Sequence, residues 1–446
     1  MRTRSLWLLS ASLLATTLAG CASTPYATPH VALAQTYAHQ TSTAAEKAPV
    51  DWWTRFGDPE LDALVTAVLA SNNDLAAAGL TLKKAQLTAG LTRLDQWPSA
   101  SAGLGVSTSD TTTYSANASV SYEVDLYGRL NDTARAANWE ARATAEDVAA
   151  TRLSLVGTTA ELYWTIAYTH RQIAVGEDNL AYARKVLDLV TIQHTAGAAS
   201  GVDLAEAQQN VSAQQASLAT LEQQLVEYRS ALTVLLGGTA WEVTREPQAL
   251  PDAPLPEIQA GLPADLLGQR PDLRAAEMRL REALATTDAT RKSLYPGLTL
   301  TGSGGGASTE LGEVLRNPTG SLAAALSLPF LDYARVQTNV KVSQTTYDIA
   351  VARFKTTWLQ ALADVDNALS NRDQLGRQAA AQGQALEAAN RVEALYAVQY
   401  RTGSVALRVW LDAQQSARAA QLAYDNIHLA QLKNQSTLYQ ALGGGT

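Results

Sequence analysis

The stretch YSANASVSYEVDLYGR, residues 114–129, alternates between apolar and polar side chains almost without exception. A period of two is typical of a β-strand with one apolar and one polar face. The positions of one parity are apolar and those of the other are polar: Ala116, Ala118, Val120, Tyr122 and Val124 against Ser115, Asn117, Ser119, Ser121, Glu123 and Asp125. Little other β-sequence lies nearby, so the strand raises the question of what its two faces contact.

Three more segments have strand character. Residues 99–106 complete a hairpin at 99–124, and residues 298–302 and 321–328 form a second hairpin at 298–328. Each strand is about ten residues long, the length that a tilted strand needs to cross a bilayer. A hairpin on a soluble helical body would alternate in the same way, but recurrence at this length favours a membrane sheet. Since four strands cannot close a barrel and open edges are not tolerated in lipid, closure requires several copies of the chain, and three copies would supply twelve strands.

The sequence contains an internal repeat, with two copies of one pattern of motifs. Asn73-Asp74-Leu75 matches Pro271-Asp272-Leu273 at an offset of 198 residues, and beyond the strands His194-Thr-Ala-Gly197 matches Tyr400-Arg-Thr-Gly403 at an offset of 206. Two constant offsets, separated by an insertion of eight residues between the strands of the second half, predict a tandem duplication in which each half is one structural unit. We expect repeats at 58–246 and 264–446, joined by a proline-rich, semi-rigid linker at 247–263.

Each repeat predicts a helix, a strand hairpin, a long helix and a return helix. The first helix begins at Asp58-Pro59, and the windows 99–246 and 330–446 lack proline, which suits very long helices. The expected long helices are 132–194 and 336–401, and the return helices are 203–236 and 405–442. A helix of this length measures roughly 95 Å. Its apolar positions lie on more than one face, so both antiparallel coiled coils and a helical barrel fit the pattern.

The first residues predict export. Residues 1–20 combine a basic start with a short apolar run and small residues, which is typical of a signal peptide. Leu18-Ala19-Gly20-Cys21 resembles a bacterial lipobox, and Cys21, the only cysteine, stands at the cleavage position. An ordinary signal peptide with an incidental cysteine is the alternative. We expect a covalent lipid on Cys21, followed by an extended segment at 21–57, with Ala22 favouring the outer membrane. One acyl anchor alone holds weakly.

Composition excludes several classes of function. The formal charge of −8 becomes −10 once Arg2 and Arg4 are removed with the signal peptide, and this disfavours a nucleic-acid partner. The five histidines lack metal-ligand spacing, and Met278 would be the only methionine of the mature chain, so no metal path is predicted. The glycine-rich residues 302–306 are interpreted as a loop between strands. We expect no enzyme activity and no cofactor apart from the lipid.

Several motifs of the chain, taken in the order in which they occur, resemble those of the TolC/OprM-type outer-membrane efflux factors, in particular their lipoprotein (NodT-like) branch. The resemblance covers residues 21–442, and its motifs are Trp52-Trp53-x-x-Phe56-x-Asp58-Pro59-x-Leu61, Asn73-Asp74-Leu75, Tyr122-Glu123-x-Asp125-Leu126-Tyr127-Gly128-Arg129, Arg270-Pro271-Asp272-Leu273, Leu328-Pro329-Phe330, Tyr400-x-x-Gly403 and Leu411-Asp412-Ala413-Gln414.

The resemblance implies a mostly α fold with a small β part. It implies a homotrimer with a 12-strand outer-membrane barrel, a 12-helix periplasmic barrel and a constricted periplasmic tip. Such a trimer docks on a periplasmic adaptor (membrane fusion) protein and an inner-membrane efflux pump, and is a passive conduit for drugs or other small solutes. The alternative is a periplasmic coiled-coil lipoprotein with a structural or adaptor role and no pore.

The candidate gate residues lie near the two predicted tip turns: Asp203, Glu206, Arg401, Val405, Leu407, Arg408, Trp410 and Asp412. Asp203 and Glu206 have the spacing of a capping box, so Asp203 is either a plain helix cap or a residue that ties helix pairs shut. Arg401 and Arg408 are either its partners or exposed basic side chains. Val405 stands where the family often has an acidic gate residue, so a hydrophobic ring of Val405, Leu407 or Trp410 is the other possible gate.

Ala334 stands where the family often has a glycine, so the second strand-to-helix turn is expected to lack a left-handed residue.

Overall fold

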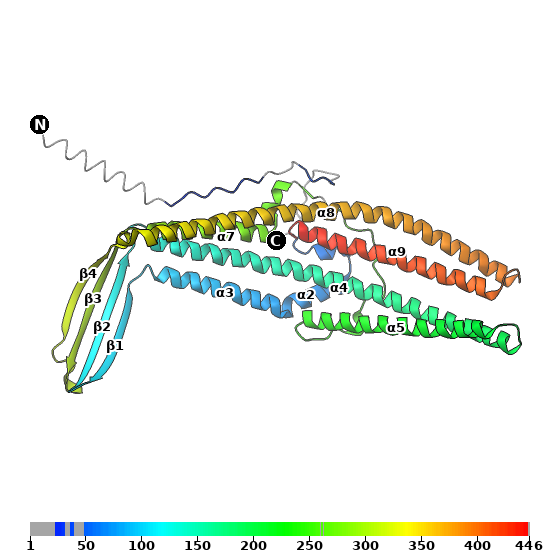
Figure 1. Cartoon of the computed structure of the whole chain (residues 1–446), viewed down its shortest axis with the longest axis horizontal. Coiled ribbons are helices and arrows are strands. Elements are labelled where there is room, and N and C mark those ends of the chain that lie inside the picture. Colours follow the sequence, from blue (N-terminus) through cyan, green and yellow to red (C-terminus); the bar gives the residue numbers. More distant parts are fainter. Residues whose placement is uncertain (1–22, 32–35, 40–48, 259, 262, 445–446) are drawn as a thin grey trace. The chain divides into compact units, whose positions relative to one another are not determined.

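The computed structural model describes residues 23–31, 36–39, 49–258, 260–261 and 263–444. The predicted signal peptide and Cys21 lie outside these residues. Both repeats have the same order of elements, as Figure 1 shows. The first repeat contains α2 (Pro59–Ser71), α3 (Asn73–Leu94), β1 (Ser99–Thr108), β2 (Thr112–Val124), α4 (Arg129–Thr195) and α5 (Gly201–Leu235). The second contains α6 (Leu266–Gln269), α7 (Pro271–Lys292), β3 (Gly297–Ser308), β4 (Thr319–Ser327), α8 (Tyr333–Arg401) and α9 (Leu407–Ala441).

The two repeats are not the two compact units of the chain. Of the described residues, one unit, called the strand unit here, comprises 23–31, 78–148 and 272–359, and the other, the helical unit, comprises 36–39, 49–77, 149–258, 260–261, 263–271 and 360–444. Each repeat contributes to both units. The boundaries of the compact units therefore do not follow the boundary between the repeats.

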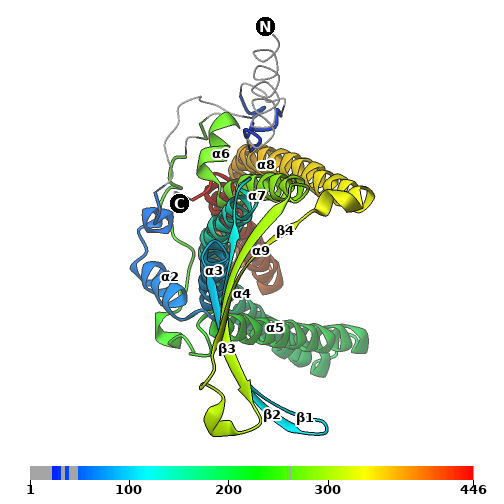
Figure 2. The same cartoon turned by 90° about the vertical axis from the view of Figure 1, so that its left-hand side faces the viewer.

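The four strands form one antiparallel sheet in the order β1-β2-β3-β4 (Figures 1 and 2). The central pairing joins the repeats, since β2 belongs to the first and β3 to the second. The register preserves the predicted alternation: Val120 lies opposite Ala100 and Gly302, whereas Ser119 lies opposite Ser101 and Ser303. On the polar face the Ser101 and Ser119 hydroxyls are 2.8 Å apart. One face of the sheet is thus apolar and the other polar across all four strands.

Residues 302–306 are part of β3 and not the expected loop. A Cβ atom added at Gly305 would lie 2.5 Å from the carbonyl oxygen of Ala116, and one added at Gly306 would collide with the carbonyl oxygen of Val314. These glycines therefore allow the strand to approach β2 and the following loop closely. Glycine serves backbone approach here and not a turn.

The opening helix of each repeat is broken once, a feature absent from the sequence-based prediction. Between α2 and α3 Asn72 is extended, with its Nδ2 donating to the Leu235 carbonyl (3.0 Å) and its Oδ1 accepting from the Leu75 amide (3.0 Å). Between α6 and α7 Arg270 is extended in the same way, and its Nη1 donates to the Ala441 carbonyl (3.2 Å). The end of each return helix thus docks on the break of its own repeat.

Both long helices begin slightly earlier than predicted, and a strand-end residue caps the first of them, α4. The Asp125 carboxylate accepts the amides of Leu130 (3.1 Å) and Asn131 (2.9 Å), after a turn in which Gly128 has φ +76°. In the second repeat a 3₁₀ helix, Pro329–Asp332, runs directly into α8, which contains Ala334. Every described residue with a positive φ is a glycine, so the second turn lacks a left-handed residue, as predicted.

The core of the helical unit is rich in aromatic side chains. Trp52 is fully buried, with its ring stacked on Tyr439 at 4.9 Å, and Phe56 packs on Trp164. The inter-repeat linker lies against the last helix, since His428 contacts the Pro251 carbonyl at 2.7 Å. By length and hydropathy no single described helix could cross a bilayer, and the pair α2 and α3 passes that test only when taken together.

Replacing Asn72 by alanine is expected to lower the free energy of unfolding by about 1–3 kcal/mol, because two buried backbone groups lose their partner. Asn72→Asp keeps the acceptor for Leu75 and should lose less. Denaturant unfolding of the purified protein measures both, with Ser71→Ala on the exposed neighbour as the control. An Asn72→Ala protein as stable as the control would show that the break does not depend on this side chain.

Candidate functional site

The two helix turns of the helical unit lie at the same end of that unit, where α4 meets α5 and α8 meets α9 (Figure 1). Both turns close on a left-handed glycine, Gly197 and Gly403, each with φ +75°. The amide of Ala198 donates to the Gln193 carbonyl (2.7 Å), and that of Ser404 donates to the Gln399 carbonyl (2.8 Å). These six-to-one hydrogen bonds are those of the Schellman motif. The duplication therefore produces two equivalent turns, called the tip here.

Asp203 belongs to a capping box, but it is not the cap. Ser200 is the N-cap of α5, and the carboxylate of Asp203 accepts from the Ser200 amide (2.8 Å) and from its hydroxyl (2.8 Å). These hydrogen bonds, the amide first, hold the pKa of Asp203 below its usual range, and the charge of Arg408 acts in the same direction. The prediction that Asp203 is the cap, with Glu206 as its partner in the capping box, is wrong. The cap lies one turn earlier, because the Ser200 hydroxyl accepts a hydrogen bond from the Asp203 amide. Glu206 is exposed.

Asp412 links the two repeats at the tip. It accepts a hydrogen bond from the hydroxyl of Tyr182 on α4, and its Oδ2 lies 3.9 Å from Nε of Arg408. Tyr182 is buried, and burial raises the pKa of its hydroxyl, with the Asp412 carboxylate adding to the effect. A neutral tyrosine that donates to a carboxylate is a directed link between helices. The sequence does not single out Tyr182, because nothing local marks which face of the 67-residue helix α4 meets α9.

The remaining gate candidates have mixed surroundings. Trp410 stacks on Tyr400 at 5.3 Å and donates through Nε1 to Glu393 (2.8 Å), so it packs α9 on α8. Arg401 is exposed and donates to the Ala397 carbonyl of its own helix (3.2 Å) and not to Asp203. Val405 is half-buried. Leu407 is the first residue of α9, and its side chain lies outside the described part of the chain. Of the expected partners of Asp203, Arg408 is therefore the one whose charge reaches it.

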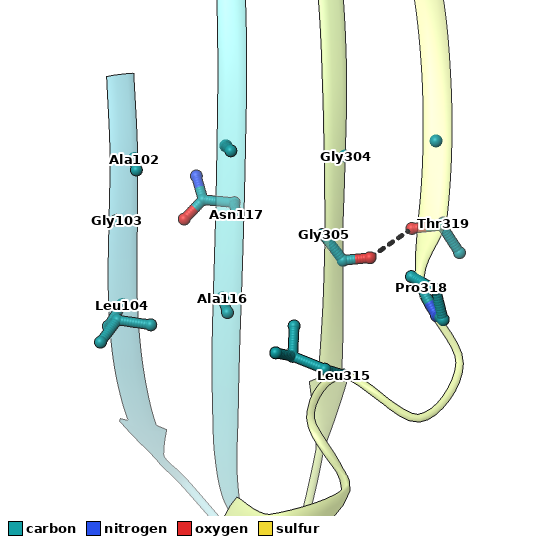
Figure 3. A pocket seen from close by; sticks show the side chains of 12 residues that line it. Ala102, Gly103, Leu104, Ala116, Asn117, Gly304, Gly305, Leu315, Pro318 and Thr319 are labelled. Carbon is teal, nitrogen blue, oxygen red and sulfur yellow. Dashed lines mark hydrogen bonds between the residues drawn. The ribbon is translucent and has the colours of Figure 1, made fainter. Parts of the chain in front are cut away.

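The apolar face of the sheet exposes large side chains. Leu104 is 89% exposed and Leu322 94%, and Val120 on a central strand is 49% exposed. Figure 3 shows residues that line a pocket on this sheet: Leu315 of the β3–β4 loop lies near Ala116, and Pro318 lies near Thr319. Contiguous exposed apolar surface of this kind marks a contact with another apolar phase or partner.

Among the described residues there is no group of acidic, histidine or cysteine side chains arranged to hold a metal ion.

A profile of the outer membrane efflux protein family matches residues 64–238 and 262–444, one match in each repeat. The chain belongs to the outer membrane efflux protein family. It is 32% identical to the pyoverdine export outer membrane protein OpmQ of Pseudomonas aeruginosa, over 100% of this chain and 98% of that protein. It is 29% identical to the toluene efflux pump outer membrane protein TtgC of Pseudomonas putida, over 98% of this chain and 95% of that protein.

A solved structure is similar over the whole fold. The open state of the outer membrane channel MtrE of Neisseria gonorrhoeae has a TM-score of 0.80 at 28% identity, covering 95% of this chain and 98% of that one. The resemblance drawn from the motifs is thus confirmed, and so is the mostly helical, duplicated fold. The chain is the outer-membrane channel component of an efflux system, and its family is one of transport channels. The alternative, a coiled-coil lipoprotein without a pore, does not describe this chain.

Val120→Arg is expected to destabilise the assembled protein by about 2–4 kcal/mol if the apolar face of the sheet contacts lipid, because it places a charge on that face near the middle of a strand. Ser119→Arg, one residue away on the polar face, should be far milder and should change conductance. The midpoint of denaturant unfolding in detergent or lipid compares the two variants. Equal losses would contradict the assignment of the two faces.

Proposed function

We propose that three copies of this chain assemble into a trimer whose sheets join edge to edge into a 12-strand barrel. The observation that supports this proposal is that β1 and β4 each pair on one side only. Unpaired backbone groups in hydrocarbon cost several kcal/mol each, so a four-stranded sheet needs neighbours at both edges. Two copies would give an eight-stranded barrel that side chains fill, whereas three leave an open lumen. The long helices of the three copies then form the periplasmic barrel.

The assembled trimer is a passive conduit. Its polar sheet face, made of serine, threonine and asparagine side chains, lines the lumen, and the apolar face meets lipid. A periplasmic adaptor protein connects the tip to an inner-membrane pump, which supplies the energy, and the channel itself needs no catalytic group or cofactor. The cargo is drugs or other small solutes, a class consistent with relatives named for pyoverdine and for toluene.

The chain carries a lipid on Cys21, and the barrel supplies most of its affinity for the membrane. Cys21→Ser should block lipidation while leaving a trimer that still inserts in the outer membrane. Membrane fractionation and gel filtration in detergent measure the two properties separately. A Cys21→Ser protein that is wholly soluble and monomeric would contradict the barrel.

Single-channel recording in planar bilayers tests the function directly. The purified full-length protein should conduct in discrete steps, because a polar lumen through the membrane passes ions. A trimer that inserts but never conducts would contradict a polar lumen that passes through the membrane.

The tip is the gate in this proposal. Tyr182 and Asp412 hold α4 against α9, and Arg408 lies within reach of the charges of both Asp203 and Asp412. The ion pair of Arg408 and Asp412 is exposed and therefore weak by itself, but threefold symmetry repeats each contact of the tip. A bias of that size is one that an adaptor can overturn through its preference for the open state. Val405, Leu407 and Trp410 form the alternative, a hydrophobic constriction that closes by dewetting.

The double variant Tyr182→Phe with Arg408→Ala should raise resting conductance and admit vancomycin into cells, because it removes the hydroxyl donor and the shared cation. Arg401→Ala is the matched control, since Arg401 donates to the Ala397 carbonyl of its own helix. Bilayer recordings and vancomycin susceptibility measure the effect. Wild-type conductance from a folded double-variant trimer would assign the gate to the hydrophobic residues.

A further inference from the structure

Two buried carboxylates lie in the strand unit where α4 begins and α7 ends. The side chains of Asp132 and Asp288 are 0% and 3% exposed. Lys292, itself 6% exposed, lies 2.7 Å from Asp132, and Arg135 lies 2.9 Å from Asp132 and 3.6 Å from Asp288. Buried charges are tolerated only when they are paired and hydrogen-bonded. This cluster belongs to the strand unit and has no part in the channel function described above.

The segment that follows the lipidation site fills the cluster. Ser23 donates through its hydroxyl to Asp132 (3.0 Å) and accepts from Nζ of Lys292 (3.1 Å). Thr24 donates to Asp288 twice, through its amide (2.8 Å) and its hydroxyl (2.7 Å). The first residues of a domain are usually poorly ordered unless they are tied down. Here two consecutive residues are held by side chains from both repeats.

Distances decide how much Asp288 depends on this segment. The nearest guanidinium nitrogens, those of Arg291 and Arg135, are 3.5 and 3.6 Å away, beyond good hydrogen-bond length. The two donors of Thr24 are the short contacts. Without Thr24 the carboxylate would keep its counter-charges but lose its best hydrogen bonds in a buried place. Asp132 is less dependent, since Lys292 and Arg135 both reach it directly.

A further contact continues the segment along α7. The guanidinium of Arg281 lies 4.5 Å from the ring centre of Tyr26 and 5.0 Å from that of Trp139 on α4. Arg281 therefore interacts with one ring of the segment and one ring of the first repeat. Tyr26 is half-buried there. Residues 23–26 thus bridge α4 of the first repeat and α7 of the second.

We propose that Asp132, Asp288 and Lys292 form a socket that docks residues 23–26 and so turns the lipid on Cys21 into a fixed anchor. The inference rests on the proposed function in assuming a lipidated channel. Cys21 is three residues before Thr24, so at most about 10 Å of fully extended chain separates their Cα atoms, and the socket tethers the lipid closely. Lys292 ends α7 and β3 begins at Gly297. The acyl chains therefore enter the bilayer at the level where the strands begin, and socket and anchor together set the depth of the sheet in the membrane.

Chymotrypsin tests the docking, because the bond after Tyr26 is cleavable only when the segment leaves the helices. The full-length lipidated trimer in detergent is digested, and mass spectrometry follows release of the lipopeptide 21–26. Thr24→Val, which keeps the shape but loses the hydroxyl donor, should be cleaved about tenfold faster than the wild type, the effect of losing one hydrogen bond to a charged group. Thr24→Ser keeps the donor and should restore protection. Asp288→Asn should be cleaved faster still, and the thermal melting of each variant shows that the trimer remains folded.

The results separate this proposal from the proposed function. Cleavage of the wild type as fast as that of Thr24→Val, or no difference between Thr24→Val and Thr24→Ser, overturns the socket even if the channel conducts normally. Slow cleavage of the wild type, fast cleavage of Thr24→Val and rescue by Thr24→Ser support it. That pattern in a protein without conductance would contradict the proposed function and leave the socket standing.

Discussion

The need to pair every backbone amide and carbonyl in hydrocarbon is the constraint on which the account of this protein depends. The four strands satisfy one another in an unbroken antiparallel register, and β1 and β4 are left with one open edge each. In water an open edge is a risk of aggregation, whereas in lipid it is a large free-energy penalty. The same edges therefore make the isolated chain incomplete and specify where its neighbours attach. The alternation of side chains then decides which face meets lipid and which meets the lumen.

Because the chain is duplicated, the same structural contacts occur once in each repeat. Asn72 and Arg270 occupy the same break in the opening helix, and each donates to the last carbonyls of the return helix of its own repeat. The tip turns are likewise equivalent, with Gly197 and Gly403 at the same backbone angle. Function uses the places where the copies differ. Asp412 and its counterpart Glu206 are both exposed, and Asp412 accepts a hydrogen bond from Tyr182 and lies near Arg408.

The parts of the fold that the sequence predicts correctly are those with a one-dimensional signal. Alternation at 114–124 marks β2, and the two constant offsets place the equivalent helices and turns of the second repeat. The errors occur where distant residues decide. Residues 302–306 resemble a loop until Ala116 and Val314 are seen to approach them, and Asn72 resembles a mid-helix residue until Leu235, 163 positions away, accepts its amide. Tyr182 could not be assigned because the rotation of α4 about its axis is set by packing. Ser200 and Asp203 are both suitable N-cap residues for α5, and the spacing of the sequence alone does not show which of them is the cap.

The mass of the intact assembly tests the central claim most directly. Native mass spectrometry of the full-length protein, extracted from outer membranes in mild detergent, counts the chains that share one barrel. The account predicts three copies, because three four-stranded sheets close with an open lumen and leave no edge unpaired. A folded, membrane-extracted protein with the mass of one chain would contradict it, since both edges of the sheet would then stand open in lipid.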